Sequence, residues 1–171
     1  VGTGKNKLQV RLLGSGTILR EVRDAAAILR KDYKVSVDVF SATSINELAR
    51  DGMAVDRWNM LHPQAKPQVS YVAQCLAGND SPVIAATDYM KLFAEQIRAF
   101  VPAPYKVLGT DGFGRSDSRE KLRGFFEVNS KYIVVAALNE LSHTGAVKKS
   151  DVAEAIKKFG LDPEKINPVL A

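Results

Sequence analysis

Residues 8–41, LQVRLLGSGTILREVRDAAAILRKDYKVSVDVFS, decide the fold of this 171-residue chain. The run 8–14 alternates and then becomes continuously apolar, which is typical of a buried strand. The run 35–41 alternates again and predicts a second strand. Between them, 17–31 has the apolar spacing of an amphipathic helix. The residues on its apolar face are Ile18, Val22, Ala25 and Leu29. The stretch therefore predicts a strand–helix–strand unit, whose two strands run parallel.

The rest of the chain repeats this alternation of strands and helices. Two further strands are expected over 82–87 and 105–110. Expected helices cover 45–59, 69–78, 89–100, 117–126, 130–143 and 150–159. Such an order favours the α/β class, as a three-layer α/β/α sandwich around a mainly parallel sheet.

Composition excludes several classes of protein. Hydrophobic residues make up 46% and charged residues 25% of the chain, as in ordinary globular domains. No apolar run approaches the roughly 18 residues of a membrane span. A single cysteine, Cys75, rules out an internal disulfide, and no basic-then-apolar leader opens the sequence. We expect a cytoplasmic domain without a membrane partner.

The net charge of +5 raises the question of nucleic-acid binding. This excess lies within residues 1–34, which hold eight Lys and Arg against three acidic residues, while the other 137 residues balance. A groove for single strands needs aromatic residues among its basic ones, and this segment offers only Tyr33. We therefore expect no nucleic-acid partner.

The first glycine turn, Gly14–Thr17, follows a strand and opens a helix. Amides at such a helix start can hold an anion, so the turn is a candidate for binding a nucleotide or another anion in a regulatory module. The dinucleotide fingerprint also needs glycine or alanine at position 19, where leucine stands. The simpler alternative is a tight strand-to-helix turn. Among the residues that bind metals, Cys75, His62 and His143 show no ligand spacing, and the apolar run around Cys75 predicts a buried, inert thiol.

A second glycine-rich stretch, VLGTDGFGRSDSREKL at 107–122, lies at the expected carboxyl end of a strand. Open α/β sheets place their functional loops at that end. Asp111 and Arg115 flank Phe113 there, and a polar pair around an exposed aromatic is typical of an interface. We predict that these three residues contact a neighbouring domain or subunit.

The same stretch resembles the strand–loop–helix of the C-terminal domain of transketolase-like enzymes. The runs YIVVAALNEL, LLGSGTILREVRDAA, SINELARDG, DRWNMLHP, TDYMKLFAEQIR and KINPVLA also resemble the thiamine-dependent first component of the homodimeric bacterial pyruvate dehydrogenase complex. This resemblance covers nearly all of 7–171. It implies a transketolase C-terminal-like domain over 8–171, preceded by a linker or truncated edge at 1–7. The family's sheet has five strands, so an antiparallel edge strand is expected from upstream.

The resemblance also implies what the parent enzyme does. That family decarboxylates pyruvate on thiamine diphosphate and Mg²⁺, then reductively acetylates the lipoyl group of its partner, the dihydrolipoyl acetyltransferase. Its cofactor motif, Gly-Asp-Gly followed later by Asn-Asn, is absent here, since Thr110, Asp111 and Gly112 do not match it. No catalytic, cofactor-binding or metal residue is carried over. The chain alone is expected to be inactive, to bind no cofactor, and to support interdomain packing and dimerisation.

Overall fold

A computed structural model describes residues 8–171. Its sheet has four strands in the order β2-β1-β3-β4, and every neighbouring pair is parallel. The strands are β1 (Gln9–Gly14), β2 (Ser36–Ser41), β3 (Val83–Ala86) and β4 (Tyr105–Leu108). All four predicted strands are confirmed, and so is the parallel sheet. The expected linker at 1–7 lies outside the described residues.

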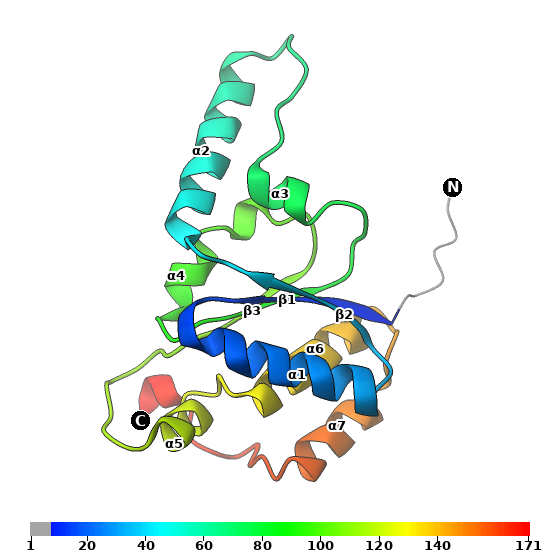
Figure 1. Ribbon diagram of the computed structural model, residues 1–171, viewed down its shortest axis with the longest axis vertical. Coiled ribbons are helices and arrows are strands. Elements are labelled where there is room, and N and C mark those ends of the chain that lie inside the picture. The colour runs from blue at the N-terminus through cyan, green and yellow to red at the C-terminus, as the bar shows by residue number, and fades with distance from the viewer. Residues whose placement is uncertain (1–7) are drawn as a thin grey trace.

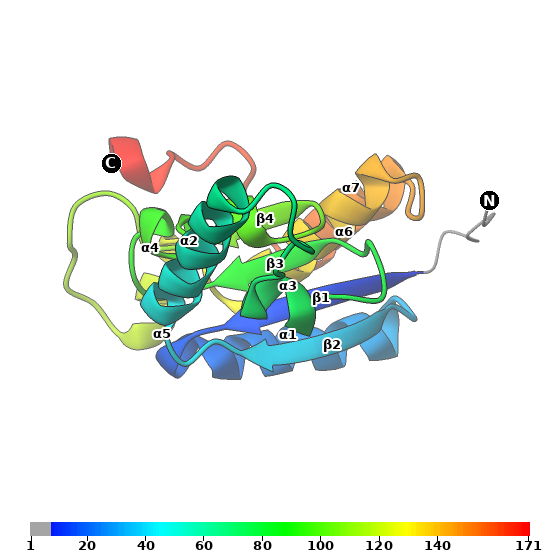
Figure 2. The ribbon, with the colours of Figure 1, turned by 90° about the horizontal axis from the view of Figure 1, so that it is seen from above.

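Helices cover both faces of the sheet, which confirms the predicted sandwich (Figures 1 and 2). One layer contains α1 (Leu19–Asp32), α6 (Ser130–His143) and α7 (Lys149–Lys158), with α5 (Arg119–Phe125) at its end. The opposite layer contains α2 (Ile45–Leu61), α3 (Tyr71–Cys75) and α4 (Lys91–Glu95). Three 3-10 turns complete the chain: η1 (Gly16–Ile18), η2 (Arg98–Phe100) and η3 (Pro168–Leu170).

The strands divide their side chains between two cores. Alternate residues point to opposite faces, so Leu12 and Ile84 join the core under α1 and α6. Leu13 and Ala85 join the core under α2, α3 and α4. In this part of the chain, none of the helices is both long and apolar enough to cross a membrane.

The predicted helix over 89–100 is broken in the structure. Met90 has extended backbone, so α4 begins only at Lys91 and ends at Glu95, and η2 follows as a separate turn. Val101 is also extended, because the ring of Pro102 disfavours helical backbone in the residue before it. The helix expected over 130–143 is confirmed as α6, whose N-cap is Asn129, whereas α7 begins at Lys149, one residue before the expected start.

A buried arginine fastens the loop before β3 to the centre of the sheet. Arg11 of β1 is 1% exposed, and its guanidinium donates to the carbonyl oxygens of Leu76 and Ser81. Desolvation lowers its pKa from the ordinary value. Because these carbonyls compensate the buried charge, the loop is held across the end of the parallel strands.

The described sheet has two open edges, β2 and β4. At the β2 edge the Arg30 guanidinium donates to the Val37 carbonyl over 2.6 Å, so a side chain covers part of it. All four strands of 8–171 are parallel, and the antiparallel edge strand expected from upstream is not among them.

Candidate docking face

The loops that follow β3 and β4 are joined by hydrogen bonds at the carboxyl end of the sheet. The Thr110 amide donates to the Tyr89 carbonyl over 2.9 Å, and the Thr110 hydroxyl donates to the Asp88 carbonyl over 2.8 Å. These bonds fix segment 87–92 against segment 109–115. The two loops therefore present one continuous surface.

Asp111 lies inside this pair of loops. Its Oδ1 accepts the backbone N–H of Lys91 over 2.8 Å, and its Oδ2 lies 3.5 Å from Lys91 Nζ. The carboxylate thus holds the first residue of α4 in place. Of the three predicted contact residues, Asp111 positions the surface from within the chain.

Two glycines explain how the loops approach so closely. A Cβ on Gly109 would lie 2.7 Å from the Lys91 amide nitrogen. A Cβ on Gly112, whose φ is +104°, would lie 2.2 Å from the carbonyl oxygen of Pro168. Gly112 therefore lets η3, at the end of the chain, pack against the loop.

Phe113 stands at the tip of this loop and is 80% exposed. Other large apolar side chains of these two segments and of η3 are exposed as well. We call this set the docking face: Tyr89, Met90, Leu92, Phe113, Val169 and Leu170. Such a set of exposed apolar side chains makes this surface a candidate for contact with another domain or subunit. The prediction from sequence included Phe113 but not the other five residues. In the sequence, these five appear only as apolar residues of the helix expected over 89–100 or near the end of the chain.

Arg115 follows Phe113 by two residues in the same loop. Its guanidinium stacks over the Phe125 ring at 4.4 Å from the centroid. This cation–π contact ties the loop to α5. Phe113 alone of the three predicted residues belongs to the exposed apolar surface, while Asp111 and Arg115 brace it.

The Gly14–Thr17 turn faces a carboxylate. The Ser15 hydroxyl donates to Thr87 Oγ1 over 2.9 Å, and the Thr17 hydroxyl donates to Asp88 Oδ2 over 3.1 Å. Asp88 places negative charge beside this helix start, and the Arg123 guanidinium donates to Thr17 Oγ1 over 3.2 Å, so the polar groups of the turn are already engaged within the chain. The geometry does not support the anion-binding alternative and fits a tight strand-to-helix turn.

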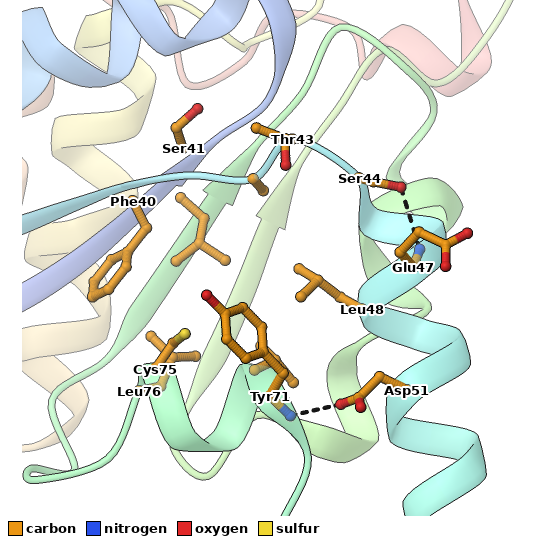
Figure 3. Close-up of a pocket in the computed structure, with 13 residues that line it drawn as sticks. Phe40, Ser41, Thr43, Ser44, Glu47, Leu48, Asp51, Tyr71, Cys75 and Leu76 are labelled. Atoms are coloured by element: carbon orange, nitrogen blue, oxygen red, sulfur yellow. Dashed lines mark hydrogen bonds between the residues drawn. The ribbon is translucent and has the colours of Figure 1, made fainter.

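A separate pocket of about 640 Å³ lies between the end of β2 and helices α2 and α3 (Figure 3). Tyr71 and Cys75 line it from α3, and Leu48 points into it from α2. A hydrogen bond with the Cys75 thiol raises the pKa of the Tyr71 hydroxyl. Cys75 is exposed, so the predicted burial of its thiol is wrong, because α3 turns this residue outward. Across residues 8–171, no three His, Cys, Asp or Glu side chains gather as a metal site.

Comparisons with known proteins give a family and several relatives. The model of the transketolase-like TK C-terminal domain matches residues 1–129. A pyruvate dehydrogenase E1 component of Pseudomonas aeruginosa is 63% identical over 161 residues, which cover 94% of this chain and 18% of that protein. The corresponding component of Escherichia coli K12 is 62% identical over 167 residues, covering 97% of this chain and 19% of that protein. This chain thus spans about a fifth of the length of these curated relatives.

A solved structure has the same fold. It is described as a split-gene transketolase, an inactive beta4 tetramer, and matches with a TM-score of 0.51 at 15% sequence identity. The match covers 80% of this chain and 40% of that one. At this identity the likeness concerns the arrangement of strands and helices.

Proposed function

Because this chain belongs to the family of transketolase-like C-terminal domains, we propose that it is the domain of that type in a thiamine-dependent pyruvate dehydrogenase. The parent enzyme decarboxylates pyruvate on thiamine diphosphate and Mg²⁺ and reductively acetylates the lipoyl group of a dihydrolipoyl acetyltransferase. It works as a homodimer within a larger complex. The high identity to pyruvate dehydrogenase E1 components supports this assignment.

The role of this domain is to pack against its neighbours in the parent enzyme. The observation that carries this role is the docking face, where six large apolar side chains are exposed together on braced loops. Asp111 fixes the first residue of α4, and Gly112 lets η3 approach. A surface ordered in advance loses little conformational entropy when it binds.

Within residues 8–171, no three Asp, Glu, His or Cys side chains gather to hold the Mg²⁺ of the thiamine cofactor. A diphosphate with Mg²⁺ needs oxygen ligands that can turn toward the metal. Asp111 belongs to the tripeptide Thr110-Asp111-Gly112, which partly resembles the family's Gly-Asp-Gly motif. Both of its carboxylate oxygens, however, already contact Lys91. We therefore assign the cofactor to other domains of the parent enzyme.

Replacing Phe113 tests the docking role. In the full-length parent protein, Phe113→Ala removes the most exposed apolar side chain of the docking face. We expect the unfolding midpoint of the parent to fall and its dimer dissociation constant to rise about tenfold, since buried aromatic anchors carry much of the energy of an interface. Calorimetric unfolding and sedimentation measure the two effects.

Val69→Ala is the matched control, because Val69 is also apolar and exposed but lies on the segment after α2. It should leave both quantities unchanged. If Phe113→Ala behaves like this control, the docking role is wrong.

A further inference from the structure

Helix α2 extends well beyond the layers of the sandwich (Figure 1). Its buried residues are confined to the first half: Ile45, Ala49 and Gly52. Packing there is close, since a Cβ on Gly52 would lie 2.2 Å from the Phe100 ring. The second half of α2 and the returning segment 62–70 form a projection that we call the arm.

The arm is held in shape by polar contacts. The Asn59 side chain donates to the Gln68 carbonyl over 3.0 Å and accepts the Gln68 N–H over 2.8 Å. The rings of Trp58 and His62 stack with centroids 4.3 Å apart. Asp51 accepts the Tyr71 N–H where the returning segment reaches α3. An element with almost no core of its own is thus kept rigid.

One side of α2 carries exposed apolar side chains away from the returning segment. Met53 is 57% exposed, Met60 70% and Leu61 51%. Met53 and Met60 are seven residues apart, two helical turns, and so lie on one stripe. Asn59, which binds the returning segment, points to another side of the helix. The stripe is therefore open along its length.

Two opposite charges lie in the middle of this stripe. Asp56 and Arg57 are both exposed. Within residues 8–171 neither makes an ion pair or a hydrogen bond. Adjacent residues on a helix do not face each other, so Asp56 and Arg57 cannot satisfy one another within one chain. Both charges are therefore free to pair with a second molecule.

We propose that the arm packs antiparallel against the α2 arm of a second copy of this chain. A twofold axis between Asp56 and Arg57 sets Met53 against Met60 of the second copy. It also sets Asp56 against Arg57 of the second copy, and symmetry makes each contact twice. The stripe is self-complementary in both apolar surface and charge. The homodimer of the proposed function thereby gains a specific contact surface, distinct from the docking face.

Single helix pairs bury less surface than a stable dimer needs, so the 171-residue chain alone should associate weakly, with a dissociation constant of about 100 μM. Sedimentation equilibrium over a concentration series measures it. Asp56→Arg and Arg57→Asp each set like charges against each other, and we expect each to weaken association about tenfold. The double variant Asp56→Arg/Arg57→Asp restores the opposite pairs and should regain most of the lost affinity.

Glu154→Lys on α7 is a control that alters charge elsewhere, and circular dichroism checks that every variant is folded. A chain that stays monomeric at millimolar concentration would overturn the inference, as would a double variant no better than the single ones. The inference rests on the proposed homodimer, but the two can fail separately. Phe113→Ala should leave the association of the isolated chain unchanged, whereas the charge variants should weaken it, so measurements on the isolated chain separate the two proposals.

Discussion

Gly112 and Gly114 lie in the same loop, but only position 112 requires glycine. Gly112 has a φ of +104° and a would-be Cβ 2.2 Å from the Pro168 carbonyl oxygen, whereas Gly114 has open space around it. The letters G-F-G give no hint of this difference. Only the position of η3, more than fifty residues further along the chain, creates it.

At Gly112 we predict a clear loss of stability on substitution. Gly112→Ala forces an L-residue into left-handed backbone and against a carbonyl, so the free energy of unfolding should fall by about 2 kcal/mol. Gly114→Ala should change it by less than about 0.5 kcal/mol. Denaturant titration of both variants provides the measurement. Equal stabilities would mean that η3 does not pack on Gly112.

Sequence reasoning at this scale drew attention to the loop but could not assign the contacts that its residues make within the chain. Phe113 is exposed, as its polar flanks indicated. Asp111 and Arg115, predicted to face a neighbour, contact Lys91 and Phe125 of the same chain. Those partners come from other loops and helices, so no local pattern could name them. The remaining question of what the docking face contacts stays a prediction.

Asn59 determines the shape of an entire element. Asn59→Ala removes both hydrogen bonds to the Gln68 backbone, so the returning segment should detach from α2. We expect hydrogen exchange at the Gln68 amide to rise about tenfold or more, since net hydrogen bonds contribute roughly 1 kcal/mol each. Global stability should change little, because the arm buries almost no core.

Asn46→Ala on the same helix is the control for this prediction. Asn46 accepts a bond from Gln96 and does not contact the returning segment. Exchange at Gln68 should therefore match that of the unmodified chain. If Asn59→Ala gives the same result as Asn46→Ala, the Asn59 contacts do not hold the arm.

Elements with strong periodicity were predicted well. The apolar spacing of 17–31 and the alternation of 35–41 correspond to α1 and β2. The helix expected over 89–100 was wrong in extent, because extended backbone at Met90 and before Pro102 limits it. The helix expected over 45–59 is confirmed as α2, but its projection was not predicted, since sequence periodicity does not say whether a helix lies on the sheet or projects from it.

At the scale of the whole molecule, we expect this chain not to bind the thiamine cofactor on its own. Titrating the 171-residue chain with thiamine diphosphate and Mg²⁺ in a calorimeter should give no saturable heat. Asp111 is already engaged by Lys91, and residues 8–171 contain no group of three Asp, Glu, His or Cys side chains that could hold a metal ion. Pyrophosphate alone serves as the comparison. Saturable binding of the complete cofactor would show that part of the active site lies here.

The place of β1 in the sheet also bears on the order in which the molecule folds. Its contacts toward β2 join residues only 29 positions apart, as between Gln9 and Asp38. Its contacts toward β3 span 70 positions, as between Arg11 and Ser81. Closing the longer loop costs more chain entropy, so we expect the β1–α1–β2 unit to form first and β3 to insert later. Until β3 is in place, the Arg11 guanidinium lacks the Leu76 and Ser81 carbonyls that it binds in the native structure. Insertion of β3 would then bury this charge and fasten the preceding loop to the sheet.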